Sequence, residues 1–195
     1  MEKENSKFGA KQIATTAILL AICIVSQFFK NLSVFITGPI INACLVFVVL
    51  MVNLPCGIIL SIITPITAWL ITGNPLMGAV PGIIPLIMAG NAVLVIMVHF
   101  WLKDDMIKGG AKGGGVKSYV KAFVCSLAKG VFMGLTISMW LLPTFLPQES
   151  PLRGKMSVFQ TTFSLHQFLT ACIGFVYVFI IWVAVYRFAV GDKTE

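Results

Sequence analysis

Long apolar stretches alternate with short polar ones along this chain of 195 residues. A helix needs about 20 mostly apolar residues to cross the hydrocarbon core of a bilayer. Stretches near that length predict membrane-spanning helices over 10-30, 39-54, 57-72, 77-102, 118-142 and 161-190. Pro55 and Gly57 leave almost no linker between the second and third helices, which predicts a tight helical hairpin. We therefore predict an all-α membrane protein in which six transmembrane helices form one compact bundle and a single domain.

Lys129 interrupts the apolar run from Tyr119 to Leu142 near its middle. A lysine at this depth costs roughly 2.5 to 3.5 kcal/mol on insertion scales, so its ammonium normally faces a polar cavity or a partner. The sequence therefore predicts an interior cavity at Lys129, with a structural partner such as a backbone carbonyl as the alternative.

Polar and aromatic residues recur at helical spacing around this lysine. On the fifth predicted helix, Lys129, Met133, Thr136 and Trp140 share one face and lead from mid-membrane toward the outer surface. On the sixth, His166, Thr170, Gly174 and Tyr177 form a similar stripe with Gln167 adjacent, and the two faces are expected to meet. The remaining polar candidates are Gln27, Lys30, Asn31, Asn42, Thr72, Asn74 and Asn91. For Asn42 and Asn91 the alternative is an interhelical hydrogen bond.

The basic residues gather in alternate connections. Lysine and arginine are retained in short cytoplasmic loops, and their distribution here predicts that both termini and the loop 103-117 are cytoplasmic. That loop is rich in glycine and lysine and predicts a flexible linker. The net charge of +7 is thus a signal of topology and of contact with anionic lipid rather than with nucleic acid. The start of the chain has no small-residue cleavage pattern, so the first helix is expected to be retained.

Catalytic and metal sites find little support in the sequence. All seven acidic residues lie outside the predicted spans, which argues against intramembrane metalloproteases, aspartyl proteases and most proton-driven carriers. The stretch from Gly110 to Ser118 departs from the phosphate-loop pattern. Ser126 and Lys129 match the SxxK spacing of penicillin-binding enzymes, but the companion motifs are absent. The five cysteines are scattered without a CxxC pair, so no disulfide or metal site is expected. With the acids and motifs above, we expect no bound cofactor and no enzymatic activity.

The first predicted helix carries Ala10, Ala14, Ala17 and Ala21 at small-xxx-small spacing, which lets another helix approach closely. The chain resembles the substrate-binding S components of energy-coupling factor (ECF) transporters. The resemblance rests on this alanine pattern, on the size and the six predicted helices, and on the segments Gly38-Pro39, 30-34 and 167-171. The resemblance covers almost the full length. It implies the plasma membrane of a bacterium and an outward-facing pocket for a small water-soluble vitamin or related micronutrient.

The resemblance also implies partners. The alanine face of the first helix would dock on a membrane-embedded T protein, which joins two cytoplasmic ATPases that use ATP to drive reorientation and release of the solute inside. For the pocket we expect Lys129 to attract an anionic group and Trp140, Tyr177 or Trp69 to provide apolar or stacking surface. The polar residues expected to bind solute are Asn91, His166, Gln167, Thr170, Lys30 and Asn31. The alternatives are a stand-alone carrier, a membrane scaffold and, more distantly, a hydrolase using Ser126.

Overall fold

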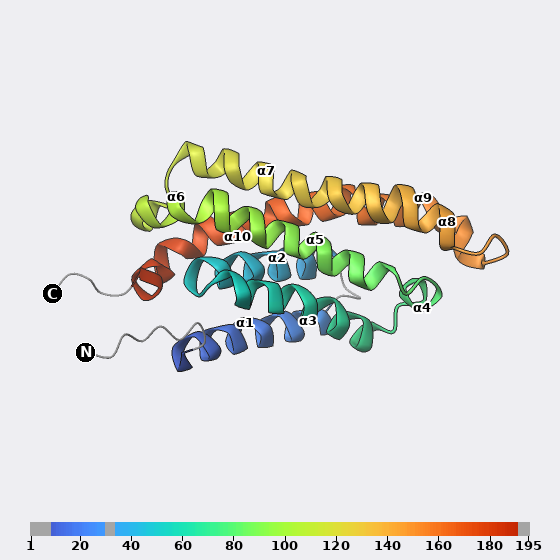
Figure 1. Ribbon diagram of the computed structural model, residues 1–195, viewed down its shortest axis with the longest axis horizontal. Coiled ribbons are helices and arrows are strands. Elements are labelled where there is room, and N and C mark those ends of the chain that lie inside the picture. Colours follow the sequence, from blue (N-terminus) through green and yellow to red (C-terminus); the bar gives the residue numbers. More distant parts are fainter. Residues whose placement is uncertain (1–8, 30–33, 191–195) are drawn as a thin grey trace.

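The computed structural model describes residues 9–29 and 34–190, the side chains of Val34 and of 187–190 excepted. This part of the chain folds into helices and contains no strand, which confirms the predicted all-α class (Figure 1). The first half contains α1 (Ala10–Phe28), α2 (Val34–Met51), α3 (Leu54–Thr72), α4 (Pro75–Ala79), α5 (Ile83–Met97), the π-helix η1 (Val98–Leu102) and α6 (Lys103–Lys108). The second half contains the short 3₁₀ helix η2 (Gly110–Lys112), α7 (Val116–Met133), the π-helix η3 (Gly134–Leu141), α8 (Leu142–Phe145), the 3₁₀ helix η4 (Pro151–Lys155), α9 (Met156–Phe163) and α10 (Leu165–Val190).

Within the described ranges, the helical segments that are long and apolar enough to cross a membrane are Ala10–Phe28, Leu54–Thr72, Ile83–Lys108, Val116–Phe145 and Pro151–Tyr186. A shorter apolar helix, Phe35–Met51, accompanies them. This arrangement fits a multi-pass membrane bundle.

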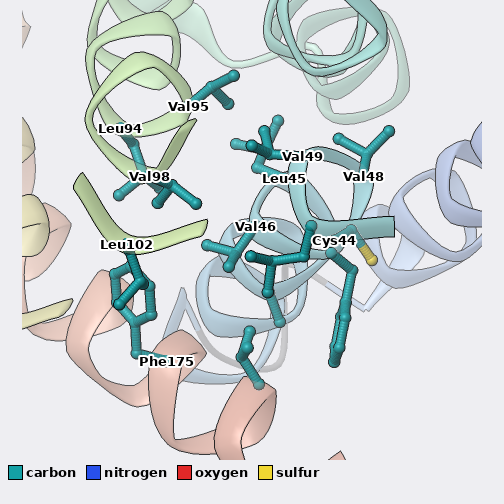
Figure 2. Packing of buried hydrophobic residues seen from close by; sticks show 14 of the residues in the cluster. Cys44, Leu45, Val46, Val48, Val49, Leu94, Val95, Val98, Leu102 and Phe175 are labelled. Atoms are coloured by element: carbon teal, nitrogen blue, oxygen red, sulfur yellow. The ribbon is translucent and has the colours of Figure 1, made fainter. Parts of the chain in front are cut away.

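Helix α2 forms the centre of the bundle and packs against α10, α1, α3 and α5 (Figure 1). Every residue from 42 to 50 is buried, so this stretch is apolar on nearly all sides rather than amphipathic. Figure 2 shows Leu45, Val46 and Val49 of α2 packed toward Leu94 of α5 and Val98 of η1. A second apolar cluster, formed by α4, α5, the end of α7, η3, α8 and α9, includes Ile83, Met133 and Ile137. Buried polar residues, among them Asn42, Asn91 and Lys129, lie on the helices that carry these clusters.

The hairpin predicted between the second and third helices is present. Asn53 caps α3, because its side-chain oxygen accepts a hydrogen bond from the Cys56 backbone N–H at 2.9 Å. Pro55 lies in the first turn of α3, where a missing backbone N–H costs no helical hydrogen bond.

The elements divide between two ends of the bundle (Figure 1). The start of α1, the link from α2 to α3, α6 and the end of α10 lie at one end, drawn on the left, which we call the α6 end. Helices α4 and α8 lie at the opposite end, which we call the α4 end.

The loop 103-117, predicted as a flexible linker, is largely ordered as α6 and η2. Met106 of α6 is fully buried, and its apolar side chain gives the helix a reason to pack. The Lys103 ammonium donates to the Val49 carbonyl at 2.8 Å, and the Trp182 indole donates to the Gly110 carbonyl at 3.0 Å. The loop is therefore attached to α2 and α10.

The fourth predicted span begins later than the predicted residue 77. Pro81 lies in the turn between α4 and α5, and Pro85 lies in the first turn of α5. Both positions suit a residue without a backbone N–H, so the prolines separate two helices instead of kinking one.

Candidate functional site

Lys129 lies on α7 and is almost completely buried, with 2% of its surface exposed. Its ammonium donates to the side-chain oxygen of Asn42 on α2 at 2.6 Å and to that of Asn91 on α5 at 2.7 Å. One charged group thus connects three helices. The partners are side-chain amides rather than the backbone carbonyl considered from the sequence.

The hydrogen bonds continue from Asn42 into α10. The Asn42 Nδ2 group donates to the Thr170 hydroxyl at 3.4 Å, and that hydroxyl donates to the Gln167 carbonyl at 3.2 Å. Because the Asn42 oxygen accepts from Lys129 and its nitrogen donates to Thr170, the amide has one favourable orientation. Asn42 and Asn91 therefore form interhelical hydrogen bonds, and these bonds orient the ammonium.

Two glycines allow the helices that carry this network to approach closely. A Cβ atom at Gly174 of α10 would come within 2.9 Å of the Asn42 Cβ and 3.0 Å of the Pro39 carbonyl oxygen. A Cβ atom at Gly90 of α5 would come within 2.6 Å of Met133 on α7. Such contacts are too short for a larger residue without movement, so glycine brings α2 and α10, and α5 and α7, into range of Lys129.

A cavity of about 180 Å³ opens beside Lys129. Its walls come from the halves of α1, α2 and α3 nearer the α4 end, together with α4, α5, α7, α9 and α10. The polar side chains among the lining residues are Gln27, Thr37, Asn42, Thr64, Asn74, Asn91, Lys129, Thr162 and Gln167. The rest are Gly38 and the apolar residues Ile41, Pro65, Ala68, Met77, Ile87 and Phe163.

Among the described residues that line this cavity, Lys129 is the one with a charged side chain. The acids in the described part of the chain, Asp104, Asp105 and Glu149, lie in α6 and in the connection before η4. An ammonium has three N–H donors. Two donate to the asparagines, and no acceptor for the third occurs among the described residues. The arrangement can therefore bind an anionic oxygen with an oriented, desolvated cation.

The residues predicted to bind solute divide into several groups. Lys129, Asn91 and Gln167 line the cavity. Thr170 is 1% exposed and supports Asn42 without lining the cavity. His166 is half-buried outside the cavity lining, where its ring lies 5.1 Å from that of Phe35 in an edge arrangement. Lys30 and Asn31 lie outside the described residues.

The three aromatic residues considered for the pocket lie outside the lining of the cavity. Trp140 is 55% exposed, contacts Phe145 and does not line the cavity. The α-helical spacing from Lys129 is interrupted by η3, and a π-helix takes more residues per turn, so Trp140 leaves the face of Lys129. Tyr177 is 36% exposed and is also absent from the lining. It follows Gln167 by ten residues, roughly 15 Å along α10 toward the α6 end. Trp69, the third aromatic considered, is absent from the lining as well.

The cavity also contains residues that the sequence did not single out for binding. Gln27, Asn42 and Asn74 were among the general polar candidates, whereas Thr37, Thr64 and Thr162 were not. A threonine in a helix commonly donates to the carbonyl one turn earlier, as Thr64 does to Leu60 at 2.8 Å. Such residues give no sequence signal that separates a binding role from a local one.

Ser126 and Lys129 do not form a hydrogen-bonded pair. The Ser126 hydroxyl donates to the Ala122 carbonyl at 3.0 Å, while Lys129 donates to the two asparagines. The described part of the chain also contains no cluster of three or more His, Cys, Asp or Glu side chains that could hold a metal ion. The five cysteines are free.

The predicted docking residues on α1 are all on the surface. Ala10, Ala14, Ala17 and Ala21 are exposed, and α1 is the least buried of the five long apolar segments. Comparison of the chain with known protein families, curated proteins and solved structures finds no match.

Proposed function

We propose that this protein captures a small anionic solute in the cavity at Lys129 and acts as the substrate-binding subunit of an ATP-driven importer of the ECF type. The observation that carries the proposal is the buried ammonium, held by two neutral amides, facing a cavity and paired with no carboxylate among the described residues. A charge buried in a bilayer is costly, and such residues usually pair with a partner or face a functional cavity. An anionic solute would compensate it.

Neutral partners leave the charge of Lys129 available. A carboxylate at the same place would neutralise the ammonium and reduce its attraction for a solute, whereas an amide oxygen orients it without cancelling its charge. Because Lys129 is almost completely buried, the attraction between its ammonium and a bound anion is stronger than it would be at the surface. The solute class that we propose is a small water-soluble vitamin or related micronutrient with an anionic group.

The proposed orientation places the α4 end outside the cell and the α6 end in the cytoplasm of a bacterium, with six spans and both termini inside. Lys103, Lys108, Lys112, Lys117 and Lys121 gather on and around α6, and this clustering supports the orientation. The cavity lies in the half of the bundle nearer the α4 end and would then receive solute from outside. A membrane-impermeant thiol reagent should label Gly154→Cys, but not Lys112→Cys, in intact cells; the reverse pattern would contradict this orientation.

The proposed partners are a T coupling protein in the membrane and two cytoplasmic ATPases. The exposed alanines of α1 support this assignment because they offer a face on which another helix could pack closely. Reconstitution of the single chain in liposomes separates this proposal from a stand-alone carrier: uptake without partners would exclude the need for them.

The solute itself is best identified by mass spectrometry of material retained through gentle purification. Lys129→Met should weaken binding of that solute at least tenfold, because the variant keeps much of the side-chain volume and removes the charge. Ser126→Ala is the matched control, since it removes a buried hydroxyl one turn earlier on α7 without touching this cavity. Unchanged affinity in a folded Lys129→Met protein would exclude the role of the charge.

A further inference from the structure

Gln27 presents a buried acceptor that the described protein does not satisfy. The residue lies in the last turn of α1, lines the cavity and is 1% exposed. Its Nε2 group donates to the Thr64 carbonyl at 3.1 Å, whereas its Oε1 atom is buried and has no hydrogen-bond donor. A buried acceptor left without a donor is unfavourable, and exceptions of this kind require an explanation.

The orientation of the Gln27 amide follows from its surroundings. Exchanging the amide nitrogen and oxygen would place Oε1 against the Thr64 carbonyl, so that two acceptors would face each other. The Thr64 carbonyl also accepts from the Thr67 hydroxyl at 3.1 Å, which confirms its role as an acceptor. The unsatisfied atom is therefore the oxygen, and the group that completes it must be a donor.

We infer that the solute carries an anionic group for Lys129 and, at another position, a neutral N–H or O–H donor for the Gln27 Oε1 atom. This inference rests on the proposed function, because it describes the solute of the same cavity. Ile41, Pro65 and Ile87 among the lining residues provide apolar surface for the body of such a molecule. Cavities of this kind take a mainly apolar ligand whose orientation is set by a few polar contacts.

The donor is neutral because the described lining of the cavity has no group to pair with a second cation. None of these lining residues is acidic, and the charge among them is that of Lys129. An ammonium on the solute would be repelled by Lys129 and would lose its hydration without compensation. Zwitterionic amino acids and cationic vitamins are therefore outside the inferred class.

The size of the cavity limits the solute further. A protein cavity of about 150 Å³ holds one benzene molecule. The cavity beside Lys129 has a volume of about 180 Å³. The inferred solute is accordingly compact, with a body near the size of one six-membered ring that bears the anionic group and the donor.

Simple ring carboxylates test this inference on the purified full chain in detergent. The probes are benzoate, 3- and 4-hydroxybenzoate, and 4-methoxybenzoate, and affinity is measured by isothermal titration calorimetry. At least one hydroxybenzoate should bind about tenfold more tightly than benzoate, the gain expected from one neutral hydrogen bond. The methoxy compound, which has an acceptor but no donor, should show no such gain. Equal affinities for benzoate and both hydroxybenzoates would overturn the inference.

A substitution of Gln27 tests whether this residue causes the preference for hydroxybenzoate. Gln27→Met removes the acceptor while keeping similar bulk, so it should reduce hydroxybenzoate binding to the level of benzoate and leave benzoate binding unchanged. Ser61→Ala is the control, since it removes a fully buried hydroxyl of α3 that does not line the cavity. A preference for hydroxybenzoate that survives in folded Gln27→Met would also overturn the inference. If Gln27→Met does not fold, the comparison of hydroxy and methoxy probes on the native chain remains decisive.

The two proposals fail in different ways. Carboxylates that bind through Lys129 without any preference for a donor would leave solute capture intact and remove the role of Gln27. If no carboxylate in the set binds the native chain, the inferred class is wrong. The proposed function is then tested separately. It requires that a solute is retained through purification and that the binding of this solute depends on Lys129.

Discussion

At the scale of single residues, the site depends on a buried cation whose hydrogen-bond partners are neutral. Asn42 and Asn91 come from different helices and accept from the same ammonium at 2.6 and 2.7 Å. Removing one partner of a buried charge is generally more harmful than replacing the whole group by apolar residues. Without solute, a single substitution at Lys129 or at one of these asparagines should therefore destabilise the bundle more than its share of a double substitution that removes both partners.

Asn91→Leu should lower the stability of the solute-free protein by about 1–3 kcal/mol, because the buried ammonium loses an acceptor. The measurement is the midpoint of thermal unfolding in detergent. Asn91→Leu combined with Lys129→Met should be less destabilised than the sum of the two single variants, since no charge is then left without its partner. Strictly additive losses would show that the hydrogen bond between these residues does not contribute to stability.

The residues of this site could be predicted from the sequence only in part. Lys129 was recognisable because a charge in an apolar run is rare, and Asn91 and Gln167 because they are polar at the right depth. The unsatisfied oxygen of Gln27 could not be predicted, since it depends on where the Thr64 carbonyl lies in three dimensions. Trp140 does not line the cavity, and the expected spacing had assumed an uninterrupted α-helix where η3 occurs.

At the scale of helices, the geometry of the site depends on how closely α2 and α10 pack. Gly174 lies where a side chain would meet the Asn42 Cβ and the Pro39 carbonyl oxygen. The second of these contacts is with backbone, which cannot move as a flexible side chain can. The separation of the two helices at this point therefore controls whether Asn42 reaches both Lys129 and Thr170.

Gly174→Ala should separate α2 from α10, lower the thermal stability by about 1–3 kcal/mol and weaken solute binding. Alanine is favoured over glycine in a helix by about 1 kcal/mol, which would offset part of the loss. Gly78→Ala on α4 is the matched control, because a Cβ there meets nothing within 4 Å while the gain in helix propensity is the same. If both variants are equally stable, close packing at Gly174 is not required.

The elements themselves were more predictable than their details. Apolar length predicted the helices, and Pro55 with its neighbours predicted the hairpin completed by the Asn53 cap. The order in 103-117 was not predictable from its glycines, because it depends on the burial of Met106 and on a hydrogen bond from Trp182, far along the chain. Local composition describes the freedom of an isolated segment and not the contacts it makes after folding.

At the scale of the whole molecule, the bundle encloses its polar groups around the cavity and leaves α1 at its edge. Helix α1 packs against α2 and α3, whereas Ala10, Ala14, Ala17 and Ala21 are exposed. Small residues on an exposed membrane helix bring the backbone of a partner close, and close packing is a main source of helix association in lipid. The proposed function assigns this surface to the T protein.

Ala17→Leu with Ala21→Leu should abolish copurification with the T protein and ATPases while leaving the affinity for solute unchanged. The added side chains would hold a partner helix away from α1, but neither alanine lines the cavity. Ala184→Leu is the matched control, since Ala184 is an exposed alanine on α10 at the opposite end of the sequence. Assembly that survives the double substitution would show that α1 faces lipid instead of a partner. Loss of assembly in the Ala184→Leu control as well would show that the effect is not specific to α1.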